Sequence, residues 1–75
     1  MNLHGDIVEN LRYAVQSAAR LRGHRVHADT LIFWGDLLTF ARQEARHSDA
    51  DRRLTLDGLI EKLESEIAER KSPRP

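Results

Sequence analysis

Apolar residues recur at spacings of three and four along most of the chain, and this period is typical of α-helices that bury one face. The first repeat comprises Ile7, Leu11, Ala14, Val15, Ala18 and Leu21, with Val8 at its margin. It predicts a helix over about residues 4–22. Gly23 is expected to end this helix, because glycine readily takes the left-handed conformation that follows many helix C-termini.

The pattern is broadest over a second predicted helix, at about residues 29–46, which holds three of the four aromatic residues. It carries two apolar stripes: Leu31, Trp34, Leu38, Ala41 and Ala45 form one, and Phe33, Leu37 and Phe40 form the other. Together they cover about half of the circumference, more than the stripe of about 100° that a surface helix needs. Asp29 is the expected N-cap, since its carboxylate can accept hydrogen bonds from the first turn.

A third helix is predicted to end near residue 71, and it has two alternative starts. Ser48 followed by Asp51 has capping-box spacing and favours a start near residue 50. Thr55 as N-cap, with apolar residues placed as a hydrophobic staple, favours a start at residue 55. Beyond either start, a narrow apolar seam has the spacing of a coiled coil: it comprises Leu56, Ile60, Leu63 and Ile67.

These elements predict an all-α fold, a small three-helix bundle made of an antiparallel helical hairpin and a third helix. We expect one domain over residues 1–71 and a flexible tail at 72–75, where two prolines prevent helix continuation. A closed monomer is one possibility. However, each buried aromatic side chain needs about 150–250 Å² of matching surface, and the alanines of the first helix supply little. We therefore expect a homodimer that uses the Phe33–Phe40 stripe or the seam of the third helix.

Composition narrows the class of protein. The 75 residues include no cysteine, and 12 basic residues balance 12 acidic ones, which excludes a disulfide scaffold and a strongly basic nucleic-acid binder. No apolar run approaches the roughly 18 residues of a membrane span, and no signal peptide is evident, so we expect a cytoplasmic protein. Arginine greatly outnumbers lysine and alanine is frequent, which favours a bacterial source with a GC-rich genome.

Residue types that carry chemistry are present, but their settings argue against catalysis. His24, His27 and Asp29 lie close together, yet Arg25 stands among them and would repel a divalent cation, so we expect no metal and no cofactor. Acidic residues of the third helix, Glu66 among them, are interpreted as a solvated face, with Glu66 and Arg70 spaced for an ion pair. A single layer of helices rarely encloses an active-site pocket, and we expect no enzymatic activity.

Basic residues gather at the end of the first helix and in the loop that follows. Arg20, Arg22 and Arg25 form a candidate contact for an anion or a nucleic acid, although basic charge is also favourable at a helix C-terminus. A helix-turn-helix interpretation is poor, because the second helix carries aromatic residues and the third exposes carboxylates that phosphates would repel.

The sequence therefore predicts a small protein-interaction module, and we expect a bacterial regulator that binds a protein partner through its apolar helix faces. The expected anchors are Tyr13, Phe33, Trp34, Leu37 and Phe40, since aromatic residues dominate binding hot spots. One alternative is a dimeric DNA-binding regulator that uses the edge from Arg20 to His27. Another is a structural subunit of a larger assembly.

Overall fold

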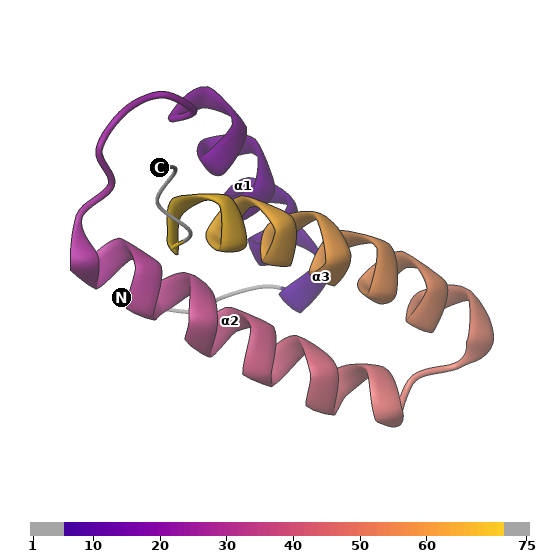
Figure 1. Cartoon of the computed structure of the whole chain (residues 1–75). Coiled ribbons are helices and arrows are strands. Elements are labelled where there is room, and N and C mark those ends of the chain that lie inside the picture. The colour runs from indigo at the N-terminus through magenta and orange to yellow at the C-terminus, as the bar shows by residue number, and fades with distance from the viewer. Residues whose placement is uncertain (1–5, 72–75) are drawn as a thin grey trace.

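The computed structural model describes residues 6–71, and these form three helices that all pack against one another (Figure 1). Helix α1 spans Ile7–Arg20, α2 spans Ala28–Arg46 and α3 spans Ala50–Lys71. Consecutive helices run in opposite directions, so α1 and α3 run the same way on one side of α2 (Figure 1). The all-α three-helix bundle is confirmed for this part of the chain. The predicted tail at 72–75 lies outside the described residues.

Helix α1 ends two residues earlier than the pattern predicts. Leu21 follows it as the C-cap, and Gly23 takes a φ of 82° in the turn, as expected of a glycine at this position. Because the helix has already ended, Leu21 does not continue the buried face and is 37% exposed. Val8, which the pattern places at the margin of that face, is instead buried in the core.

The N-cap of α2 is His27, so the prediction of Asp29 is wrong. The backbone N–H of Asp29 donates to Nδ1 of His27 across 3.3 Å. The helix begins one residue before the predicted start, and this places Asp29 inside the first turn. Its carboxylate there still interacts favourably with the positive end of the helix dipole.

Helix α3 begins at Ala50, and its cap is a residue that neither alternative named. Asp49 Oδ1 accepts the backbone N–H of Arg52 across 2.9 Å, which is N-cap geometry. The Ser48 hydroxyl instead donates to the carbonyl of Glu44, at the end of α2. Thr55 lies within the helix and donates to the carbonyl of Asp51.

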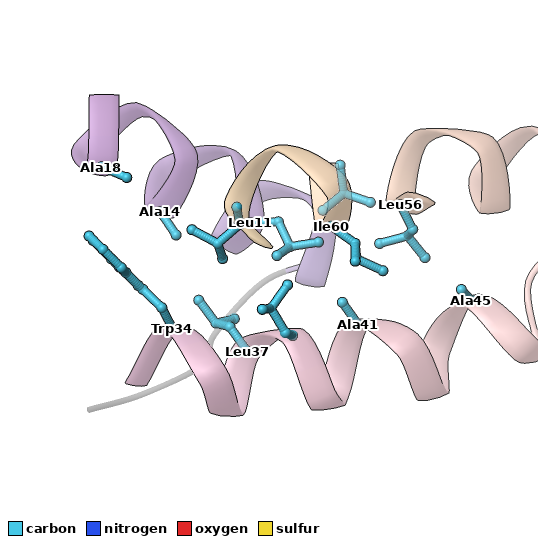
Figure 2. Close-up of a cluster of buried hydrophobic side chains, with 12 residues drawn as sticks. Leu11, Ala14, Ala18, Trp34, Leu37, Ala41, Ala45, Leu56 and Ile60 are labelled. Atoms are coloured by element: carbon cyan, nitrogen blue, oxygen red, sulfur yellow. The ribbon is translucent and has the colours of Figure 1, made fainter. Parts of the chain in front are cut away.

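The core is one apolar cluster to which all three helices contribute (Figure 2). The Trp34 side chain extends from α2 toward Ala14 and Ala18 of α1, whose small side chains leave room for the indole. Leu11 and Leu37 fill the middle of the cluster. Most of the Leu31–Ala45 stripe of α2 is therefore covered within one chain, whereas in the Phe33–Phe40 stripe only Leu37 is buried. No helix in residues 6–71 is long and apolar enough to cross a membrane.

Candidate functional site

A groove opens where the start of α1, the end of α2 and the start of α3 meet. It has a volume of about 660 Å³, and we call it the Phe40 groove; it is lined by Asp6, Ile7, Asn10, Phe40, Gln43, Glu44, Arg46, His47 and Arg52. Because α1 and α2 run antiparallel, the start of α1 lies beside the end of α2 at this groove. Of this set, the sequence predicted only Phe40 as a binding residue, because the lining combines residues that come together only when the helices pack.

Arg52 lines the groove and forms ion pairs with two of its acidic residues. Its guanidinium donates two hydrogen bonds to the Asp6 carboxylate, at 3.1 and 2.5 Å, and lies 3.5 Å from the Glu44 carboxylate. The hydrogen bond from Arg52 holds the pKa of Asp6 below its ordinary value. One side chain of α3 is thus bound to the residue that precedes α1 and to the last turns of α2.

Phe40 gives the groove its apolar surface. Its side chain is 52% exposed, next to the half-buried Ile7 in the lining. Phe33 lies two turns earlier on the same face of α2 and is half-buried. Tyr13, at 62% exposed, lies one turn beyond Asn10 of the groove. The fold therefore places Phe40 in the groove and Phe33 on the same face of α2, and it leaves Tyr13 exposed on α1.

The other two predicted anchors lie in the interior. Trp34 is 2% exposed and Leu37 is 1% exposed, so neither offers a surface to a partner in this fold. Both face the core because α1 and α3 cover them. The candidate anchors are accordingly reduced to Phe40, Phe33 and Tyr13.

Glu66 departs most from its prediction, since the pattern assigned it to a solvated face and it is 7% exposed. Arg22 donates to its Oε2 through two nitrogens, Nε at 2.9 Å and Nη2. Arg70 donates to Oε1 at 3.1 Å, which confirms the ion pair expected from their spacing. These two guanidiniums make burial of the carboxylate tolerable, and the hydrogen bond from Arg22 holds the pKa of Glu66 below its ordinary value.

Arg70 links this charged cluster to the apolar core. Its guanidinium lies 5.6 Å from the centre of the Trp34 ring, a cation–π distance, and donates to the carbonyl of Ala18 at 2.8 Å. That carbonyl belongs to the last turn of α1, where the carbonyl groups have no N–H donor four residues ahead within the helix. One arginine of α3 therefore contacts both other helices.

A second hollow, of about 460 Å³, lies beside this cluster. We call it the loop hollow; it is lined by Arg22, Gly23, His24, Arg25, Val26, Leu31, Glu69 and Arg70. Of the predicted basic edge, Arg22 and Arg25 line the hollow, whereas Arg20 is exposed at the end of α1. Arg22 is already bound to Glu66, and this reduces the charge available for an extended nucleic-acid contact.

No family model, curated protein or solved structure matches the chain.

The loop histidines are not arranged as a metal site. His27 caps α2, and its Nδ1 lies 3.8 Å from the Asp29 carboxylate, with both side chains largely exposed. Within the described part of the chain, no three histidine or carboxylate side chains converge in a way that could hold a metal ion.

Proposed function

We propose that this protein is a non-enzymatic protein-interaction module whose Phe40 groove receives the apolar face of a helix from a protein partner. The observation that carries the proposal is Phe40 itself, an aromatic side chain half-exposed in a groove beside Ile7. Grooves of this kind bind amphipathic helices through apolar side chains spaced three and four residues apart. A partner side chain seated on Phe40 would be the central anchor, with Tyr13 and Phe33 extending the contact along the α1–α2 face.

The rim charges indicate what would flank that anchor. The carboxylates of Asp6 and Glu44 are both engaged with Arg52. Arg46, by contrast, is exposed and forms no ion pair among the residues that the structure describes. The complementary partner is therefore a helix with an acidic residue near its apolar anchor. Such rim pairs mainly set association rate and partner choice.

In the expected homodimer, the protein partner would be a second copy of this chain. The seam of α3 is largely used inside the bundle, since Leu56, Ile60 and Leu63 are buried. A homodimer would therefore use the Phe40 groove rather than that seam. The balance of 12 basic and 12 acidic residues means that net charge does not oppose self-association.

We further propose that the protein is a bacterial regulator that acts in the cytoplasm, and this part of the proposal is supported by the composition of the sequence alone. The DNA-binding alternative is less favoured, because Glu66 neutralises one of the three arginines on which it depends. The structural-subunit alternative would use the same groove as a permanent interface.

The experiment uses Phe40→Asp, with Ile32→Asp as its matched control. Ile32 is also an exposed apolar residue of α2, at 63%, but it does not line the groove. Helical peptides would be selected from a displayed library against the wild-type chain, and their affinities for both variants would be measured. Light scattering over a range of protein concentrations would report self-association in parallel.

Support would consist of peptides with an apolar anchor and an acidic flank whose binding falls at least tenfold in Phe40→Asp and is kept in Ile32→Asp. A wild-type dimer that dissociates only in Phe40→Asp would identify the partner as a second copy. Equal effects of the two variants on peptide binding and on self-association would reject the groove as the binding surface.

A further inference from the structure

The loop hollow lies at the opposite end of the bundle from the Phe40 groove, and we infer that it binds the phosphate group of a small phosphate monoester. It is formed by the end of α1, the following loop, the start of α2 and the end of α3. Three guanidiniums and one imidazole line it, against the single carboxylate of Glu69. This inference is independent of the proposed protein-binding function, since the two surfaces share no residue.

The arginines are already arranged around an anion. Arg22, from the loop after α1, and Arg70, from α3, converge on the Glu66 carboxylate and donate to both of its oxygens. The Arg22 side chain nevertheless remains 64% exposed. Only Nε and Nη2 of Arg22 donate to Glu66, so Nη1 has N–H groups left for a ligand of the hollow that Arg22 lines, and the planar fork of arginine suits phosphate oxygens.

The residues around the loop hollow carry one more positive charge than negative charges, and a bound anion would balance it. Arg22, Arg25 and Arg70 carry three positive charges, whereas Glu66 and Glu69 carry two negative ones. Arg25 is exposed and forms no ion pair within the described residues. A phosphate held between Arg22 and Arg25 would supply the counter-charge that Arg25 lacks.

The remaining wall favours a small monoester over a nucleic-acid backbone. Val26 and Leu31 are half-buried apolar residues of the lining, and they can cover an apolar group attached to the phosphate. Glu69 stands at the same hollow and would repel the neighbouring phosphates of a polyanion. The ligand class is thus one phosphate with an apolar body.

The test titrates the full chain with phenyl phosphate and with inorganic phosphate, exchanged against chloride at constant ionic strength. Trp34 is the single tryptophan and lies beneath Arg70, so its fluorescence reports changes at this end of the bundle. Backbone amide NMR shifts of Gly23 and His24 locate the binding. We expect saturation by both probes, with phenyl phosphate the tighter ligand.

Arg25→Gln is the decisive variant and Arg20→Gln its control, since Arg20 is equally exposed but does not line the hollow. We expect Arg25→Gln to weaken phenyl phosphate binding about tenfold, as for loss of one charge-assisted hydrogen bond. Arg20→Gln and Phe40→Asp should bind as the wild type does.

Three results would overturn the inference. The first is an absence of saturation by either phosphate probe. The second is an equal loss in Arg20→Gln and Arg25→Gln, which would indicate a diffuse basic surface. The third is duplex DNA that binds more tightly than phenyl phosphate and depends equally on both arginines, which would assign this edge to nucleic acid.

Discussion

At the scale of single residues, Glu66 is the buried charged residue that connects α3 to the loop after α1. Its carboxylate is buried at the junction of α3 with the loop after α1, and Arg22 and Arg70 are its two partners. The sequence predicted the Arg70 pair, because both residues lie on one helix four positions apart. It did not predict Arg22, which is 44 residues away and reaches Glu66 only through the packing of the helices.

Replacing Glu66 by leucine should destabilise the fold by about 2–3 kcal/mol, because Arg70 then remains largely buried beside Trp34 without its carboxylate. Urea unfolding followed by circular dichroism measures this change. Glu69→Leu is the control, since Glu69 is exposed, and it should change stability by less than about 0.5 kcal/mol. Similar losses in both variants would show that Glu66 acts only as a surface charge.

Stability should also depend on pH through two carboxyl groups. The pKa values of Glu66 and Asp6 are lowered by their arginine partners. Groups with lowered pKa stabilise the fold fully above their ordinary values, about 4.3 for Glu and 3.9 for Asp, and this stabilisation is lost as pH falls through the lowered values. We therefore expect the free energy of unfolding to change little through these groups between pH 7 and about 5, and to decline below that.

The variant Glu66→Gln measures how much of the pH dependence of stability is due to Glu66. Its free energy of unfolding should fall less steeply than that of the wild type as pH falls below about 4.3, the ordinary pKa of glutamate, because the amide does not titrate. Urea titrations at closely spaced pH values give the two slopes. Identical slopes would mean that Glu66 titrates alike in the folded and unfolded chain.

At the scale of elements, the sequence predicts the helices well and their caps poorly. The periodicity located three helices because apolar side chains must point to one side of each. The caps were missed because His27, Asp29, Ser48, Asp49 and Thr55 are all able to cap a helix, and the choice depends on a one-residue shift of the backbone. The groove and the hollow could not be predicted, since each combines residues from separate helices.

The start of α3 can be tested by removing each candidate cap. Asp49→Ala should lower the free energy of unfolding by about 1 kcal/mol, because the backbone N–H of Arg52 loses its acceptor. Thr55→Ala should be neutral or slightly stabilising, since Thr55 is exposed inside the helix and alanine has the higher helix propensity. Thermal unfolding of both variants decides between the two starts, and a larger loss in Thr55→Ala would contradict a helix that begins at Ala50.

Two glycines should respond oppositely to substitution by alanine. Gly58 lies within α3, and a Cβ added there meets no other atom, so Gly58→Ala should stabilise the fold by about 0.5–1 kcal/mol. Gly23 has a φ of 82°, so Gly23→Ala should destabilise it by about 1 kcal/mol. Chemical denaturation measures both, and effects of the same sign would show that one of the two backbone conformations is wrong.

At the scale of the whole molecule, the question is whether the core is complete within one chain. The broad apolar surface of α2 predicts a homodimer, because the alanines of α1 offer little area to cover it. The packing instead uses those alanines to admit Trp34, and Arg70 covers the indole from α3. This arrangement was not evident from the sequence, since arginine is not a residue that a hydrophobic pattern counts as cover.

Leu37 and Phe40 belong to the same apolar stripe of α2, but their side chains should contribute very differently to stability. Leu37→Ala should destabilise the fold by about 3 kcal/mol, whereas Phe40→Ala should cost less than about 1 kcal/mol, because Phe40 is 52% exposed. The midpoint of unfolding should not change with protein concentration for either variant. A midpoint that rises with concentration in the wild type and not in Phe40→Ala would mean that a second copy completes the fold.

The two charged groups of α3, Arg52 near its start and Glu66 near its end, have a joint consequence. An apolar seam of leucine and isoleucine that repeats along a helix presents a similar surface after a shift of one turn, and shifts of this size between packed elements occur in proteins. Arg52 is tied to Asp6 and Glu66 to Arg22, at opposite ends of the neighbouring α1. A slide of α3 in either direction separates both pairs at once. The two ion pairs thus fix the position of α3 along its own axis, which its apolar seam alone would not determine.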